Sequence, residues 1–187
     1  MAEQEVPSST SNYSYHIFFS FGQDTSKTFA GHLYTALDNA GFRTFRREQD
    51  IEAGQNVELQ LQKAIERSRV SMVVFSKEYA SSSQCLDELV LILKQSRTSK
   101  HLILPVFYDV DPAEVRTLSG SFKEALTRHE DRFKAQASEW TAKIKGWKES
   151  LAEIANLAGM SLRNQTGGYV IPPFSSSFSF FLLFFSI

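Results

Sequence analysis

The stretch that decides the fold is VSMVVF, residues 70–75. It is short and almost wholly apolar, which is typical of a strand buried on both faces of a parallel sheet. A second run of this kind is HLILPVFY, residues 101–108, and a helix-like segment that opens with SSSQCLDEL, residues 81–89, separates the two. Two buried strands joined by a helix predict a parallel strand–helix–strand unit.

The segments on either side repeat this alternation. Further strands are expected at HIFFSF (16–21), FRTF (42–45) and AGMSL (158–162). Apolar residues at helical spacing predict helices that end near Ala40, surround Ile65 and run from Trp140 to Ala158. Asp24 or Thr25 is the expected N-cap of the first helix.

These elements predict an α/β fold with a doubly wound sheet of five parallel strands and helices on both faces. Ligands of such sheets bind beyond the carboxyl ends of the strands. The loops that follow Phe21, Phe45 and Phe75 should therefore meet at one edge, where the functional site is expected.

Composition excludes several classes of function. The chain has 187 residues and a formal net charge of −1, which argues against a nucleic-acid partner. It contains one cysteine, Cys85, and four scattered histidines, so no metal site is expected. The basic cluster of Arg43, Arg46 and Arg47 is interpreted as a solvated loop, because no aromatic residues alternate with it.

The domain is expected to occupy residues 15–163. Residues 1–14 are polar and lack an apolar run, so we expect a disordered leader and not a signal peptide. Residues 164–187 are expected to be a tail outside the domain, Phe/Ser-rich from residue 174 and too short in its apolar stretch to span a membrane. The expected location is the cytoplasm, with the nucleus as a second compartment, and no membrane contact is expected.

Several separated motifs resemble those of plant TIR domains in order and spacing. They are HIFFSFGQDTSKTFAGHLYTAL, AIERSRVSMVVFSKEYASS, CLDEL, LPVFYDVDPAEVR and GSFKEAL. The resemblance implies a flavodoxin-like fold and a role in immune signalling as a TIR-only or truncated form of a longer receptor. It also implies self-association, for which Gly31, His32 and Trp147 are candidates, and association with other TIR domains.

The resemblance further implies cleavage of NAD+ by assembled chains, with NAD+ as substrate and no cofactor. Glu88 of CLDEL matches the family's catalytic glutamate, and Ser82 matches a serine kept near the site. Phe21, Gly22, Phe45, Ser82 and Gln84 are the candidate substrate-binding residues. A lone carboxylate suits this chemistry, because the nicotinamide leaves without a general acid and a fixed anion stabilises the oxocarbenium-like ribose.

Periodicity alone supports a different interpretation of Glu88. On a helical wheel it falls with Gln95, roughly opposite Leu86 and Leu93, which is the position of a solvated charge. The sequence also departs from the family pattern around the site. Gln84 replaces an aromatic residue, and the first loop, SFGQDTS, is one residue shorter and lacks two arginines.

The next loop departs as well, because Arg46 and Arg47 replace the usual acidic pair. Two hypotheses therefore remain open. One is an assembly-dependent NAD+ glycohydrolase that uses Glu88, and the other is a weakly catalytic or inactive adaptor that acts through TIR–TIR association.

Overall fold

The computed structural model describes residues 13–51, 54, 56–99, 101–133 and 137–162. The leader expected at residues 1–14 and the tail expected at 164–187 therefore lie outside the described residues, except for Tyr13 and Ser14. None of the described helices is both long and apolar enough to cross a bilayer.

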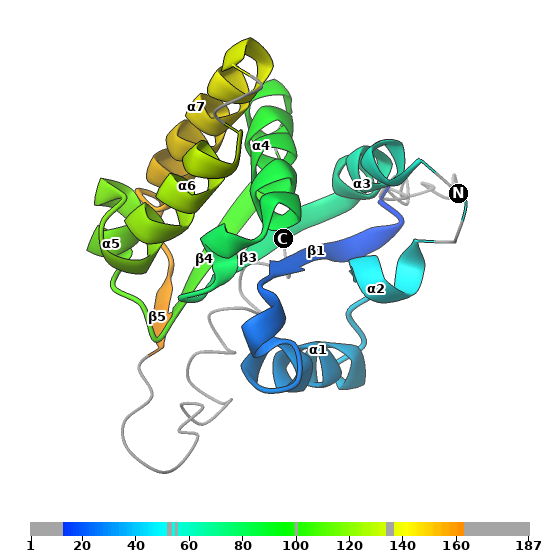
Figure 1. Cartoon of the computed structure of the whole chain (residues 1–187). Coiled ribbons are helices and arrows are strands. Elements are labelled where there is room, and N and C mark those ends of the chain that lie inside the picture. Colours follow the sequence, from blue (N-terminus) through cyan, green and yellow to red (C-terminus); the bar gives the residue numbers. More distant parts are fainter. Residues whose placement is uncertain (1–12, 52–53, 55, 100, 134–136, 163–187) are drawn as a thin grey trace, which may run out of the picture.

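Five parallel strands form one sheet in the order β2-β1-β3-β4-β5, the flavodoxin-like order (Figure 1). The strands are β1 (Tyr15–Phe21), β2 (Thr44–Phe45), β3 (Ser68–Phe75), β4 (Leu102–Tyr108) and β5 (Met160–Leu162). The predicted fold class is confirmed. Of the expected strand at 42–45, only two residues pair with β1.

Helices cover both faces of the sheet unequally. α1 (Phe29–Asn39) packs on one face, together with the apolar residues Ile17, Phe19 and Met72 of the strands. The helices that join the core of the opposite face are α3 (Val57–Glu66), α4 (Ser83–Thr98), α5 (Pro112–Thr117), α6 (Gly120–Phe133) and α7 (Ala137–Ile154). The single-turn helix α2 (Arg47–Asp50) follows β2 at its carboxyl end.

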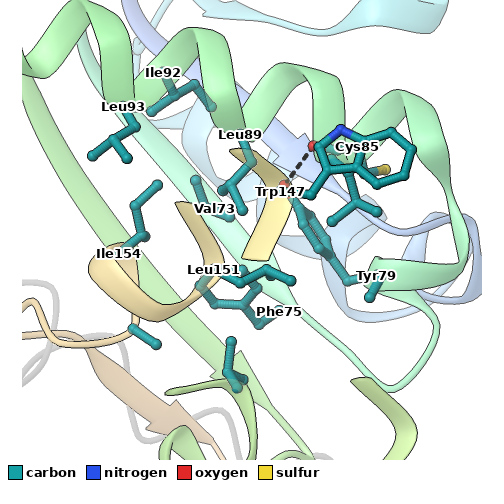
Figure 2. Close-up of a cluster of buried hydrophobic side chains, with 14 of the residues drawn as sticks. Val73, Phe75, Tyr79, Cys85, Leu89, Ile92, Leu93, Trp147, Leu151 and Ile154 are labelled. Carbon is teal, nitrogen blue, oxygen red and sulfur yellow. Dashed lines mark hydrogen bonds between the residues drawn. The ribbon is translucent and has the colours of Figure 1, made fainter. Parts of the chain in front are cut away.

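The C-terminal part of the apolar stripe of α7 lies in the core. Trp147, Leu151 and Ile154 are fully buried against α4 and the sheet (Figure 2). The indole Nε1 of Trp147 donates a hydrogen bond to Asp87 Oδ1 at 2.9 Å. The prediction that Trp147 is a self-association contact is therefore wrong, because its side chain has no exposed area for a second protomer to touch.

The first loop folds differently from the prediction. A short 3-10 turn, η1 (Gln23–Thr25), precedes α1. Neither Asp24 nor Thr25 is the N-cap of α1, because that position is Thr28. The hydroxyl of Thr25 instead donates to the carbonyl of Gly22 at 2.9 Å, and Asp24 Oδ1 accepts from Ser76 Oγ at 2.8 Å. The helix begins only at Phe29 because the capping side chains are engaged by the sheet edge.

Gly31 is required by the chain's own loop. A Cβ built at this position would lie 2.5 Å from the backbone carbonyl oxygen of Ser26. The neighbouring His32 is exposed on α1. Both remain candidates for self-association, although the close approach that Gly31 permits here is made within one chain.

Replacing Gly31 with Ala should therefore destabilise the protein, although Ala is the better helix former by up to about 1 kcal/mol. We expect the free energy of unfolding to fall by about 1–3 kcal/mol, because a backbone carbonyl must shift to admit the methyl group. Urea unfolding followed by circular dichroism measures this. Gly146→Ala on α7 is the matched control, since its Cβ would meet nothing closer than 3.9 Å, and equal effects of the two changes would contradict the packing argument.

His101 is buried directly before β4 and contacts β3. Its Nε2 lies 2.7 Å from Ser71 Oγ, its Nδ1 lies 3.0 Å from the carbonyl oxygen of Ser68, and burial lowers its pKa. The unfolded chain then binds more protons than the folded chain just below the ordinary histidine pKa of about 6.5. Stability should therefore fall as the pH drops from 7 through this range.

The free energy of unfolding, measured with urea at a series of pH values from 7.5 to 5, tests this expectation. His101→Asn should reduce the slope, whereas His32→Asn serves as the control for loss of an exposed imidazole. An unchanged slope in His101→Asn would show that His101 does not cause the pH dependence.

Candidate functional site

The carboxyl ends of β1 and β3 meet at one edge of the sheet, as predicted. Gly22, which follows β1, packs so closely on the segment after β3 that a Cβ would lie 2.9 Å from Ser76 Oγ and 3.4 Å from Tyr79 Cα. Its backbone is buried in this contact. Gly22 therefore shapes the edge, and its predicted contact with substrate stays a prediction.

Glu88 lies in the second turn of α4 and is buried. Its residue exposure is 4%, which is unusual for a carboxylate. The helix positions it one turn after Cys85 and one turn before Ile92, both of which are also buried. The interpretation of Glu88 as a solvated charge is therefore wrong, since this side of α4 faces the sheet.

Two side chains from other elements bind the two oxygens of this carboxylate. Ser20 Oγ, on β1, donates to Oε2 at 2.7 Å. Arg47 Nη2, at the start of α2, lies 2.5 Å from Oε1. Glu88 is thus held by one residue at the end of β1 and one that follows β2. Its charge is paired with the guanidinium of Arg47, a side chain that is 20% exposed.

Tyr79 extends this polar network into the core. Its hydroxyl is fully buried, lies 3.0 Å from Ser20 Oγ and donates to the carbonyl of Cys85 at 3.2 Å. Burial first, and then the nearby Cys85 and Glu88, raise the pKa of Tyr79 well above its usual value. The phenol is therefore neutral at physiological pH and acts as a hydrogen-bond donor that holds α4 to β1.

The arginines that follow β2 belong to the site, although no sequence pattern predicted them there. Arg47 is not a solvated loop residue: Nη1 donates to Gln84 Oε1 at 3.0 Å while Nη2 pairs with Glu88. Arg46 lies over the rings of Phe21 and Tyr34, with its guanidinium carbon 5.1 and 5.3 Å from their centroids. Their position directly after a strand that ends at the functional edge was the available signal.

The remaining predicted substrate-binding residues divide into two kinds. Phe45 stacks on Phe18 and is 4% exposed, and Phe21 packs against Phe19 and is 7% exposed. These rings belong to the core, which contradicts direct substrate contact through their side chains.

Ser82 and Gln84 lie at the start of α4. Ser82 is the N-cap of the helix, where its Oγ accepts from the backbone N–H of Cys85 at 3.3 Å. Gln84 is exposed beside Arg47. Gln84 lies one helical turn before Glu88, whereas Ser82 is half-buried at the helix start, and the binding role of both stays a prediction.

The site is a buried anion with an arginine at its mouth, and its chemistry follows from that arrangement. Within the described part of the chain, no group of three or more acidic, histidine or cysteine side chains is arranged to hold a metal ion. A fixed carboxylate of low solvent exposure stabilises a positive charge that develops beside it. The guanidinium is suited to bind an anion such as a phosphate.

A groove lies away from this site, between α6 and α7. It measures about 490 Å³ and is lined by Glu130, Phe133, Trp140, Thr141, Ile144, Lys145 and Lys148. Phe133 and Trp140 stack on each other at its wall. None of these residues contributes to the network around Glu88, so this groove is separate from the candidate site.

Removing the serine hydroxyl at the site should cost more than removing the phenol. Ser20→Ala leaves a buried carboxylate oxygen without its donor, so we expect a loss of about 1–3 kcal/mol in the free energy of unfolding. Tyr79→Phe removes the bonds of a neutral phenol to the Cys85 carbonyl and the Ser20 hydroxyl and should cost about 1 kcal/mol. Chemical denaturation of both variants measures the difference, and the reverse order would contradict this description of the network.

Comparisons with known proteins agree with the fold. The TMV resistance protein N of Nicotiana glutinosa is 43% identical over 153 residues, which cover 81% of this chain and 13% of that protein. Disease resistance protein RPV1 of Vitis rotundifolia is 42% identical over 162 residues, covering 86% of this chain and 11% of the relative. The chain thus spans only a small part of the length of these curated relatives.

A solved structure is also similar over nearly the whole chain. The TIR domains in the structure of the activated Roq1 resistosome directly recognizing the pathogen effector XopQ match with a TM-score of 0.76 and 39% identity, over 92% of this chain and 99% of the other. The family model of the TIR domain matches residues 14–168. The chain therefore belongs to the TIR domain family.

Proposed function

We propose that this chain is an immune-signalling TIR domain that associates with itself or other TIR domains and, when assembled, cleaves NAD+ with Glu88 as the catalytic carboxylate. The immune role is supported by the two relatives that are named as resistance proteins. The association is supported by the likeness to TIR domains of an activated resistosome. The observation that carries the catalytic part is the buried carboxylate of Glu88 at the sheet edge where ligands bind.

The reaction needs little from the protein besides this carboxylate. The bond between the ribose C1′ and the nicotinamide nitrogen breaks, and its electron pair leaves with the ring, which becomes neutral nicotinamide without being protonated. The ribose carbon develops positive charge, which the Glu88 carboxylate stabilises. Water then adds to this carbon and loses a proton, so that the products are nicotinamide, ADP-ribose and one proton.

Ser20 holds the carboxylate in place for this role. Its 2.7 Å hydrogen bond to Oε2 orients the group and leaves Oε1 for the mouth of the site. In the resting chain Oε1 is paired with Arg47. Substrate must therefore take the place of that guanidinium before Glu88 can act.

One observation favours a second candidate function. The same Arg47–Glu88 pair neutralises the carboxylate that the reaction needs, and Gln84 presents no aromatic face for a base. A domain that keeps this pair closed would act as a non-catalytic adaptor, joining larger TIR assemblies through its surface. Catalysis distinguishes the two candidates directly.

The test is loss of NAD+ and release of nicotinamide by the purified full chain, followed by NMR at increasing protein concentration with a crowding agent. We expect turnover that rises more steeply than in proportion to concentration and falls by about 100-fold or more in Glu88→Gln. Glu124→Gln, which removes an exposed charge on α6, is the control. Folded protein without turnover would support the adaptor, and full turnover in Glu88→Gln would remove Glu88 from the mechanism.

A further inference from the structure

The resting position of Arg47 leaves its guanidinium incompletely bound. Nη1 contacts Gln84 and Nη2 contacts Glu88, whereas Nε is buried without a hydrogen-bond partner. Buried donors are almost always satisfied in native proteins, so this one indicates a group that another ligand completes. A phosphate offers several oxygens in a geometry that the guanidinium fork matches.

The surrounding sequence makes Arg47 the natural place for such a ligand to bind. The loop after β1, residues 22–28, contains no arginine, and its single cation is the exposed Lys27. Arg46 is engaged on the rings of Phe21 and Tyr34 and lies on the α1 side of the sheet edge. Arg47 is the arginine that the structure places against the carboxylate itself.

Charge balance limits the kinds of ligand that can separate Arg47 from Glu88. Moving Arg47 away withdraws a cation from a buried carboxylate, which is costly unless a new positive charge arrives. Withdrawing Glu88 from Arg47 likewise calls for a new anion. A ligand that carries both a cationic ring and a phosphate on one ribose satisfies both partners in a single step.

We propose that Arg47 is a specificity-determining residue that exchanges Glu88 for a phosphate of the substrate, while the cationic nicotinamide riboside end of the same molecule takes its place on Glu88. The inference rests on the proposed function, because it assigns the substrate class of that site. The pair excludes ligands that bring only one of the two charges. It therefore selects phosphorylated nicotinamide nucleosides over the unphosphorylated riboside and over sugar phosphates that lack the ring.

The exchange is tested by binding and not by turnover. Nicotinamide mononucleotide carries both charges, nicotinamide riboside carries the cation, and ribose 5-phosphate carries the anion. NMR titration of the ¹⁵N-labelled full chain gives the Kd of each. In the wild type we expect the mononucleotide to bind at least about tenfold more tightly than either of the others, a difference of about 1.4 kcal/mol.

Arg47→Gln should change this order in a specific way. Nicotinamide riboside should bind more tightly than it does to the wild type, because no guanidinium at residue 47 competes for the carboxylate, and the advantage of the mononucleotide over the riboside should fall to about twofold or less. Arg43→Gln removes an exposed arginine of the same cluster and should keep the wild-type order. A merely structural role of Arg47 would weaken all three ligands together.

Three results would overturn the exchange. They are equal affinity of the wild type for mononucleotide and riboside, an unchanged mononucleotide preference in Arg47→Gln, and weaker riboside binding in that variant. If Arg47→Gln does not fold, the order of the three ligand affinities in the wild type still tests the proposal. The titration measures binding alone, so its outcome is independent of the NAD+ cleavage assay described above. The predicted affinity order in a chain that does not cleave NAD+ would refute the hydrolase and keep the exchange. Cleavage of NAD+ without the predicted affinity order would keep the hydrolase and refute the exchange.

Discussion

The contact between Arg47 and Glu88 is the interaction on which the site depends. It joins α2 to α4 across the ends of β1 and β2, and it places a full negative charge where the side chain is only 5% exposed. Taking a carboxylate and a guanidinium out of water costs more than most ion pairs return, so a buried pair is weak evidence for stability. Its presence at a sheet edge where ligands bind is better explained by use than by folding.

The fold supplies what makes this pair possible. The order β2-β1-β3-β4-β5 puts the ends of β1, β2 and β3 side by side, so residues 20, 47 and 88 meet although they are far apart in sequence. Gly22 lets the first loop pack closely on this edge, and Gly31 lets the Ser26 carbonyl approach α1. The buried phenol of Tyr79 ties α4 to β1 and fixes the depth at which Glu88 lies.

Much of this architecture was predictable because it rests on local patterns. The apolar runs indicated the parallel strands, and their order of appearance indicated which loops share an edge. The burial of Glu88 was not predicted correctly. A helical wheel places it opposite Leu86 and Leu93, which suggests exposure, but Cys85 and Ile92 lie on the same side as Glu88 and are buried. A charge on a buried stripe is recognisable only once its partners are known.

The roles of Arg47, Ser20 and Gly31 depend on contacts between distant segments, which no local pattern reports. In the sequence, Arg47 is one of three arginines in a loop. In the structure β2 ends at Phe45 and α2 begins at Arg47, which places this side chain against Glu88 of α4. Ser20 is one polar residue in an apolar strand until Glu88 lies opposite it. Gly31 matters only because the short first loop brings the Ser26 carbonyl against α1.

The measurement that bears most directly on the central interaction is a double-mutant cycle on the free energy of unfolding, with Arg47→Gln, Glu88→Gln and the two combined. If the pair exists as described, each single change removes one charge of the pair and leaves the other charge in place. The double variant should therefore be less destabilised than the sum of the two single variants by at least about 1 kcal/mol. Additivity within about 0.5 kcal/mol would show that the two side chains do not interact and would contradict the site built around them.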